Sequence, residues 1–352
     1  TLLFHINLSK LTVKTLKTST MTEQEKIAIA NAKIVFVVAV SGCGKSFTGD
    51  YLHFMHGYTH VDGDGPIKNC HIPRNKELTV GCFTTGLTYV LKGEDGPEEL
   101  WQPYYREIVK NTIEAAKYSD KVVLSHAAYR QSQREFTVEK LVEGGATRGN
   151  ITVLELLINP DVKLKGSYYR TKEQMENDGT TVGDNMRALG WKGVGDVTCA
   201  EYIEIMKEIR PNIASNGAWE EIPMGFGKTV DISGRDMTHL DGVDEALGLV
   251  GKRNIQDLTF EEIRDKVKVF DRKRDEEWES TGSKDIFLKI WNTISDGSVD
   301  DDDKDDNVID TTDTTEEQDT IAKRRSTLIS ADYLTRDFRR SSLSSLESTS
   351  DE

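Results

Sequence analysis

Cysteine is scarce in this chain of 352 residues: Cys43, Cys70, Cys82 and Cys199 are the only four, and they show no paired spacing. We therefore expect free thiols in a reducing compartment rather than a disulfide framework. The sequence also lacks any apolar run approaching the roughly 18 residues that a membrane-spanning helix needs, so we expect no membrane insertion.

Excess positive charge is missing as well, since the net charge is −15. Much of that charge lies between residues 296 and 319, where twelve acidic residues accompany one lysine. The remainder is only mildly acidic and shows no basic footprint for nucleic acid. With 37% apolar residues, the chain can form one large domain or two small ones.

The first 20 residues contain three lysines and many hydroxyl residues, but no acidic residue and no arginine. This composition has two interpretations. It can be the remnant of a transit peptide, or Met21 can be the true start with a disordered or non-native leader before it. We favour the second interpretation.

The most informative stretch runs from Lys33 to Tyr51. The β-branched and aromatic run from Ile34 to Val38 predicts a buried strand, and helical spacing begins at Phe47. Between them lies a phosphate-binding loop pattern with Ala in the first glycine position, which is tolerated if its φ stays negative. The loop reads Ala39-Val40-Ser41-Gly42-Cys43-Gly44-Lys45-Ser46.

Such a loop directs backbone N–H groups and the positive end of a helix at phosphate. Lys45 is expected to neutralise the β- and γ-phosphates, and the Ser46 hydroxyl to hold Mg²⁺. We therefore predict a site for ATP and Mg²⁺. The expected nucleotide contacts are Ala39, Ser41, Gly42, Cys43, Gly44, Lys45, Ser46 and Phe47.

Two aspartates follow the next predicted strand, in the sequence Asp62-Gly63-Asp64. Ligands bind at the carboxyl ends of strands in open α/β sheets, and residues two apart leave a strand on the same face. We assign Asp62 to the Mg²⁺ site and Asp64 to the acceptor, whose hydroxyl proton it would accept. A solvated Asp-Gly turn is the alternative.

Three more strands are predicted at residues 121–125, 151–158 and 228–233, alternating with helices. This alternation predicts an α/β fold with a five-stranded, parallel, doubly wound sheet. Residues 66–96 are expected to be irregular, followed by a helix over 98–117 in which Pro103 fits only the first turn.

Basic residues follow the third and fourth strands. Arg130 and Arg134 stand one helical turn apart and either grip an anionic substrate or form an exposed helix face. His126, at a strand end, is interpreted as a histidine whose hydrogen bonds are satisfied. The polar segment from Lys163 to Gly195 is interpreted as a mobile lid that brings cations such as Arg170 to the phosphoryl group. A surface helix with ordinary charges is the alternative.

Three motifs, AVSGCGKS, HVDGDG and VVLSHAAYRQSQRE, together resemble the gluconate kinases, which belong with shikimate kinases among the small-metabolite P-loop kinases. The resemblance spans about residues 33–141 and implies transfer of the ATP γ-phosphoryl group to gluconate, giving 6-phosphogluconate. It also implies substrate contacts at His71 and Asn75. The resulting catalytic set is Lys45, Asp64, Arg130 and Arg170, and the substrate-binding set is Asp64, His71, Asn75, Arg130 and Arg134.

Two departures keep other functions open. Leu100-Trp101 stands where the gluconate kinases have Asp-Arg, and residues 77–97 look like an insertion. The alternatives are a kinase of another small metabolite, such as a shikimate- or adenylyl-sulfate-kinase-like enzyme, and a nucleotide-binding regulator without transfer activity.

The predicted organisation is a leader (1–21), a P-loop kinase domain (22–250) with its lid around 163–195, a helical extension (251–295) and a disordered tail (296–352). The tail is acidic and then rich in Arg and Ser. In it, Thr327 and Ser342 each follow two arginines and resemble targets of basophilic protein kinases. We expect a cytoplasmic protein, with organelle targeting by residues 1–20 left open.

Overall fold

The computed structural model describes residues 21–177 and 179–295. The leader, the tail and the predicted phosphorylation sites Thr327 and Ser342 lie outside these residues. None of the helices in the described ranges is long and apolar enough to cross a bilayer.

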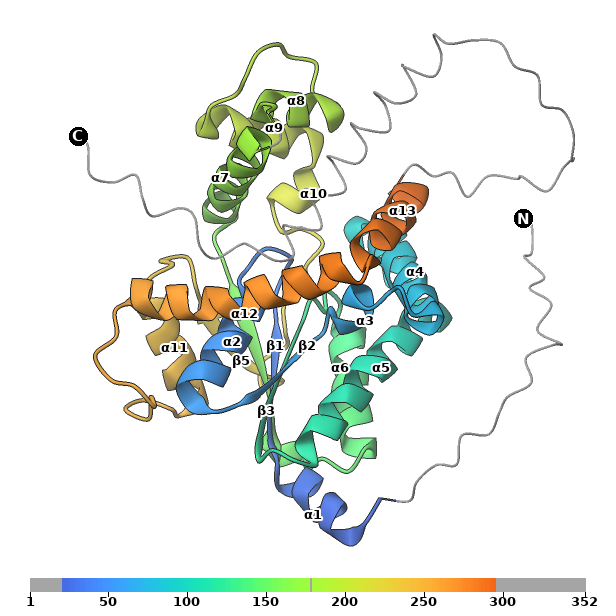
Figure 1. Cartoon of the computed structure of the whole chain (residues 1–352), viewed down its shortest axis with the longest axis vertical. Helices are drawn as coiled ribbons and strands as arrows, with labels where there is room; N and C mark the ends of the chain where they lie inside the picture. Colours follow the sequence, from blue (N-terminus) through green and yellow to red (C-terminus); the bar gives the residue numbers. More distant parts are fainter. Residues whose placement is uncertain (1–20, 178, 296–352) are drawn as a thin grey trace, which may run out of the picture.

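Five parallel strands form the centre of the molecule, as the sequence predicts (Figure 1). They are β1 (Lys33–Val38), β2 (Thr59–Asp62), β3 (Lys121–His126), β4 (Ile151–Leu157) and β5 (Lys228–Asp231). The strand order is β2-β3-β1-β4-β5. In this register Val38 lies beside His126, and Asp62 beside Ser125. The carboxyl ends of β1, β2 and β3 therefore meet at one edge, where ligands bind in such sheets.

The apolar run of β1 is explained by burial on both faces of the sheet. Ile34, Phe36 and Val38 face a core formed with α5 (Glu98–Ala116) and α6 (Gln131–Glu143). The alternate residues Val35 and Val37 face α2 (Lys45–His56), α11 (Met237–Leu247) and α12 (Phe260–Ser280). Helices on both faces of a parallel sheet, with a phosphate loop between β1 and α2, make this a P-loop fold of the α/β class, as predicted.

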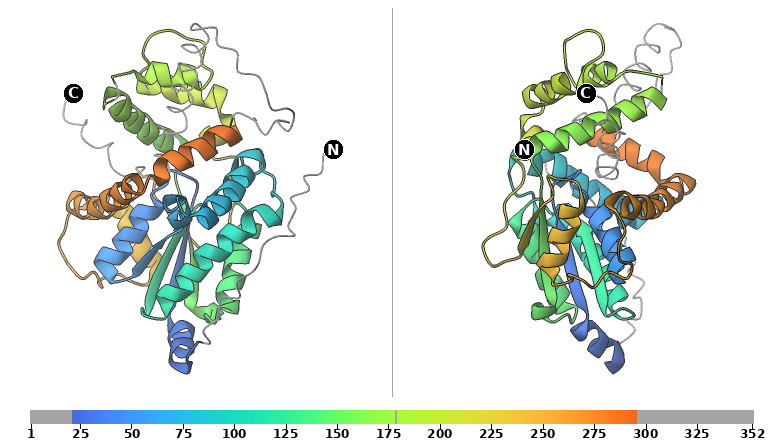
Figure 2. Two further views of the ribbon diagram at one scale, coloured as in Figure 1. Left: turned by 45° about the vertical axis from the view of Figure 1, so that its right-hand side comes forward. Right: turned by 90° about the vertical axis from the view of Figure 1, so that its left-hand side faces the viewer.

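Four helices form a smaller cluster beyond the carboxyl ends of the strands (Figures 1 and 2). They are α7 (Pro160–Asn177), α8 (Val182–Ala188), α9 (Cys199–Ile209) and α10 (Pro211–Ala214). Leu164, Tyr168, Met186 and Tyr202 give this cluster an apolar core of its own. The segment interpreted as a lid corresponds to most of α7, to α8 and to the loop after it, and its motion stays a prediction.

The prediction of irregular structure over residues 66–96 is wrong. This stretch forms α3 (Gly65–Lys68), α4 (Pro73–Thr88) and the 3₁₀ turn η2 (Val90–Lys92). The helix α4 contains two glycines and four threonines, which have low helix propensity and gave no local signal. Packing compensates for this, because a Cβ on Gly81 would lie 2.4 Å from the carbonyl oxygen of Leu100 in α5. The two helices approach that closely only with glycine there.

The expectation for Pro103 is also wrong. Helix α5 begins at Glu98, so Pro103 lies inside the helix rather than in its first turn. Its side chain is on the exposed face, where water can hydrate the carbonyl that proline leaves without a donor.

The remaining helices border this core. Helix α1 (Glu23–Asn31) precedes β1, and the turn η3 (Arg148–Asn150) precedes β4. A capping box begins α12, with Glu262 N–H donating to Thr259 Oγ1 at 3.2 Å. Helix α13 (Ser283–Ser295) then crosses to α4, where Phe287 and Trp291 join the core on the α5 side of the sheet.

Candidate active site

The phosphate loop connects β1 to α2 with the backbone that its sequence predicts. Gly42 and Gly44 have φ values of 84° and 71°, a left-handed conformation that favours glycine. Gly44 is the N-cap of α2. Ala39 is not among the three non-glycine residues of the described chain with positive φ, which fits the expectation that alanine is tolerated there. The loop thus presents backbone N–H groups at a helix N-terminus, as an anion cradle does.

Lys45 and Ser41 form the inner surface of this loop. The Lys45 ammonium donates to the carbonyl oxygen of Val40 at 3.0 Å. Burial lowers the pKa of Lys45, while the charges of Cys43, Asp64 and Asp62 act to raise it. The Ser41 N–H donates to the Tyr129 hydroxyl at 2.9 Å, and the buried Ser41 Oγ has no hydrogen-bond partner among the described residues. The loop therefore retains a buried polar atom suited to a ligand.

Besides Lys45, three cations from other segments are close enough to the loop for their charges to act on Cys43. Burial raises the pKa of the Cys43 thiol, and the charges of Lys45, Lys163, Arg235 and Arg170 oppose that rise. Lys163 and Arg170 come from α7, and Arg235 from the turn after β5. These cations converge from three separate segments, which suits a polyphosphate.

Arg235 was missed by the sequence analysis. It adopts a left-handed backbone with φ of 50°, which is uncommon for a non-glycine residue. A Cβ on Gly166 of α7 would lie 2.2 Å from its guanidinium, so glycine at 166 allows this close contact. Its buried Nη2 has no partner among the described residues. No local motif marks this arginine, because its position depends on the contact between the turn after β5 and Gly166 of α7.

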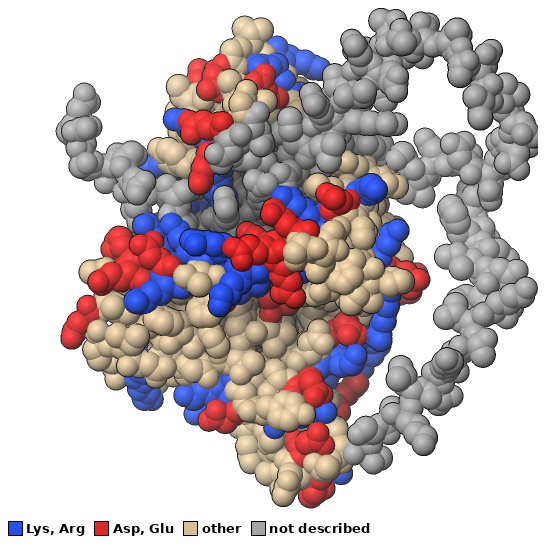
Figure 3. All heavy atoms as spheres, viewed as in Figure 1, with Lys and Arg blue, Asp and Glu red and all other residues tan. Residues whose placement is uncertain are grey.

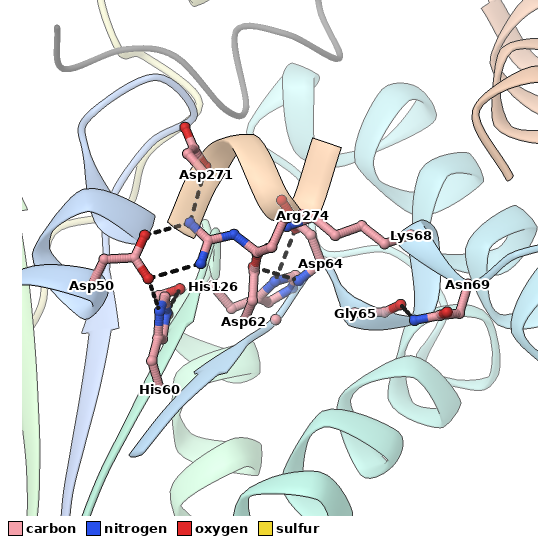
Figure 4. Close-up of polar contacts among 12 residues, drawn as sticks. Asp50, His60, Asp62, Asp64, Gly65, Lys68, Asn69, His126, Asp271 and Arg274 are labelled. Atoms are coloured by element: carbon pink, nitrogen blue, oxygen red, sulfur yellow. Dashed lines mark hydrogen bonds and ion pairs between the residues drawn. The ribbon is translucent and has the colours of Figure 1, made fainter. Parts of the chain in front are cut away.

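Asp62 is engaged in ion pairs rather than open to a metal ion (Figure 4). Its carboxylate contacts the Lys68 ammonium of α3, and Arg274 Nε of α12 lies 3.6 Å away. Burial opposes ionisation of Asp62, but Lys68, Arg274 and His60 hold its pKa below the ordinary range. Arg274 also pairs with Asp50 of α2. The helical extension therefore ties directly to the predicted metal-binding residue.

Asp64 is placed differently, since it borders a cavity together with His126. The distance from His126 Nδ1 to Asp64 Oδ1 is 3.9 Å. Gly63 between the two aspartates is required, because a Cβ there would lie 2.6 Å from His126. Tyr104 stacks on His126 with ring centroids 5.5 Å apart and donates a hydrogen bond to the Gly63 carbonyl at 2.7 Å.

The interpretation of His126 as a satisfied histidine is wrong. Its Nδ1 is buried and has no hydrogen-bond partner among the described residues. Burial, assisted by the charge of Lys45, lowers the pKa of His126 to about 3. The imidazole is therefore neutral near pH 7, and it faces the cavity beside Asp64.

The cavity has a volume of 140 Å³ and lies between the sheet edge, α4, α5 and the α7–α10 cluster. The residues that line its polar end include Ser41, Asp64 and His126. Lys163 also borders it, and the Lys163 ammonium is bonded to the Ile213 carbonyl and the Asn216 side chain of the α7–α10 cluster. The cavity is thus adjacent to the phosphate loop.

The other predicted substrate residues do not line this cavity. Arg134 is fully buried, and its guanidinium donates to the carbonyls of Ala128, Tyr129 and Glu220. Arg130 pairs with Asp95 at 2.7 Å. Both arginines therefore stabilise loops instead of facing the cavity. Their helical spacing did not predict this, because their carbonyl and carboxylate partners lie outside the helix.

His71 and Asn75, which the resemblance places on substrate, also lie elsewhere. His71 Nδ1 is 2.7 Å from the Ser283 hydroxyl of α13, and the Asn75 side chain donates to the Asn69 carbonyl at 3.3 Å. In this structure His71 joins α13 to the segment before α4.

The loop N–H groups and the nearby cations fit a nucleotide, and they fit Mg²⁺ when it is bound together with a nucleotide. No group of three His, Cys, Asp or Glu side chains among the described residues is placed to hold a metal ion. Mg²⁺ usually takes most of its ligands from phosphate and water, so a single hydroxyl such as Ser46, half-buried in the first turn of α2, can suffice. Asp62 would reach it only by giving up ion pairs.

No protein-family model matches this chain, and no curated protein matches its sequence. Among solved structures, a gluconokinase from Sinorhizobium meliloti 1021 is similar, with 17% sequence identity and a TM-score of 0.32. The match covers 63% of this chain and 97% of the gluconokinase. A likeness of this size establishes neither the family nor the substrate of this chain.

On the face seen in Figure 3, basic and acidic residues lie intermixed along α12, whose sequence alternates between them. That nucleic acid is not a partner stays an expectation.

Proposed function

We propose that the protein is an ATP-dependent kinase of a small molecule that carries a hydroxyl group. The observation that carries this proposal is the convergence of Lys45, Lys163, Arg170 and Arg235 on a phosphate loop whose other side opens to Asp64. Phosphoryl transfer requires mainly positioning and charge neutralisation, and these two features supply both.

Each residue has a defined part in this proposal. The loop N–H groups and Lys45 bind the β- and γ-phosphates, and Arg170 and Arg235 face the charge that spreads over the transferred group. The Ser46 hydroxyl would help to hold Mg²⁺ bound with ATP, and the ion would supply positive charge that neutralises the phosphates. Asp64 accepts the proton of the acceptor hydroxyl, and neutral His126, beside Asp64, orients that hydroxyl.

Asp64 also argues that the large cavity receives the acceptor rather than the nucleotide. A carboxylate at the cavity's polar end repels phosphate but accepts a hydrogen bond from a hydroxyl. A second hollow, of 10 Å³, lies beside Cys43, Phe47 and Arg235 on the β5 side of the loop.

Gluconate is the acceptor that the motifs suggest, and it stays a candidate. The Asp62-Gly63-Asp64 sequence and the placement of Asp64 support it. Against it, Arg130, Arg134, His71 and Asn75 are bonded to other parts of the protein and do not border the cavity.

The second candidate is a nucleotide-binding regulator without transfer activity. The pairing of Asp62 with Lys68 and Arg274 favours it, since a metal-binding carboxylate is normally free to reach the ion. A fluorescent ATP analogue and an ADP-release assay separate the two. A kinase releases ADP in proportion to acceptor, whereas a regulator binds the analogue and releases none with any hydroxyl compound.

A further inference from the structure

The walls of the cavity beside Asp64 are mostly apolar. From α4 and η2 come Phe83, Leu87, Val90 and Leu91, and from α5 come Trp101 and Tyr105. The α7–α10 cluster adds Leu164, Met206 and Ile213, and Trp291 of α13 closes another side. A site for a polyol would present hydrogen-bonding side chains in these places.

The polar side chains that do line the cavity away from Asp64 are already bonded within the protein. Asn216 accepts from Lys163, and Asn212 donates to the Leu91 carbonyl at 2.9 Å. Gln133 accepts from the Arg130 N–H at 3.2 Å. Each ligand hydroxyl buried against such walls without a partner would cost about 1–3 kcal/mol. A sugar acid brings several hydroxyls and a carboxylate, so the cavity disfavours it.

The size of the cavity sets the size of the group it can hold. Its 140 Å³ is close to that of an engineered apolar protein cavity of about 150 Å³ that binds benzene. One six-membered ring therefore fits without any movement of the walls, and a hydroxymethyl group on that ring can extend to the polar end.

We propose that the acceptor is a ring-bearing primary alcohol, with an apolar ring in the cavity that α4, α5 and the α7–α10 cluster enclose and with its hydroxyl at Asp64. This rests on the proposed kinase function and specifies its substrate class. In the reaction, the alcohol oxygen forms a bond to the γ-phosphorus of ATP as the bond from that phosphorus to the ADP oxygen breaks. The hydroxyl proton passes to the Asp64 carboxylate, and the products are the phosphate monoester and ADP.

Gly86 offers a variant that fills the cavity. It lines the cavity from α4, and a Cβ added there meets no atom within 4 Å. Gly86→Leu therefore places a side chain in open space, and leucine also favours the helix. The matched control is Gly149→Leu in η3, where an added Cβ is equally unobstructed and the residue does not line the cavity.

Binding is measured first, on the full chain without ATP, with benzyl alcohol as the probe. Saturation-transfer NMR and tryptophan fluorescence both report on it, since Trp101 and Trp291 line the cavity. We expect saturable binding to the unmodified protein and to Gly149→Leu, and at least tenfold weaker binding to Gly86→Leu. Gluconate should give no saturable signal. Benzyl alcohol binding that is equal in both variants, or absent from the unmodified protein, overturns the proposal.

Transfer is measured next, as ADP release with benzyl alcohol, cyclohexylmethanol, glycerol and gluconate at matched concentrations. We expect the two ring alcohols to be preferred at least tenfold, and Gly86→Leu to remove that preference while affinity for a fluorescent ATP analogue stays unchanged. Exclusive use of gluconate or glycerol overturns the substrate class but leaves the kinase function standing. A third outcome is that Gly86→Leu abolishes ring-alcohol binding but no acceptor leads to ADP release. That result contradicts the kinase function, while the cavity's preference for rings stands.

Discussion

The two sides of the phosphate loop differ in what they offer a ligand. On the β5 side, the charges of Lys45, Arg170 and Arg235 all act on the loop at Cys43, so this side suits an anion. The α4–α5 side presents a cavity with apolar walls and one carboxylate, Asp64. The contrast shows how a single loop can bring a highly charged donor to a weakly polar acceptor, since each is held by the chemistry it matches.

Removal of the loop cation should have the largest effect on activity. Lys45→Ala should abolish phosphoryl transfer, lowering its rate by at least about 10³-fold, because the Lys45 ammonium is the charged group within the loop that neutralises the phosphates. ADP release measures the loss, and circular dichroism checks the fold. Lys33→Ala is the control, since Lys33 is exposed at the opposite end of β1. Normal turnover in Lys45→Ala would mean that the charged side of the loop is not a phosphate site.

Substitution of Asp64, the carboxylate on the apolar side, should have the second-largest effect on activity. Asp64→Asn retains shape but cannot accept a proton, so kcat should fall by about 10²–10⁴-fold. Affinity for the ATP analogue should change little, because the substitution is on the acceptor side. Asp95→Asn, on the surface beside Arg130, is the comparison variant. If Asp64→Asn weakened ATP binding instead of turnover, the division between the two sides would be wrong.

The pH dependence of ATP affinity tests whether Lys163 belongs to the charged side. Burial, partly offset by Cys43, lowers the pKa of Lys163 to about 8. Bound phosphate favours the protonated form, so ATP affinity should be constant below pH 8 and fall above it, by at most about tenfold per pH unit. Titrations from pH 7 to pH 9.5 should show this fall. Lys163→Arg, which stays charged, should remove it; an unchanged slope in that variant would exclude Lys163 as the source.

The smallest effect expected is slow alkylation of Cys43. A thiol at a helix N-terminus ordinarily has a lowered pKa, but burial raises the pKa of Cys43, which is only 1% exposed. Iodoacetamide followed by mass spectrometry should therefore label the half-buried Cys199 first. Bound ATP should slow labelling of Cys43 further, and its alkylation should block ATP binding by bulk. Labelling of Cys43 as fast as Cys199 would show that the loop side is open to solvent.

The charged side of the phosphate loop was easier to predict from the sequence than the apolar side. The phosphate loop, the five strands and the Asp62-Gly63-Asp64 turn are local patterns, so they could be predicted from adjacent residues. The apolar side depends on residues far apart in sequence, and α4 has too many glycines and threonines to be recognised by propensity. His126 was noticed but misinterpreted, although its place at the end of a buried strand, near the predicted Asp62 and Asp64, is consistent with a place in the site. Arg235 could not have been predicted as a site residue, since only its contact with Gly166 in the folded structure places it near the loop.

The ties between the helical extension and the site have a consequence for how the protein is made. Asp50 and its partner Arg274 are 224 residues apart, and Trp291 completes a cavity whose other walls are synthesised much earlier. A chain leaving the ribosome would expose the apolar residues of α4 and α5 until α12 and α13 had emerged. High contact order slows folding, and exposed apolar surface invites aggregation. We therefore expect nascent chains to rely on chaperones until α13 docks, with ATP-binding competence acquired late in synthesis.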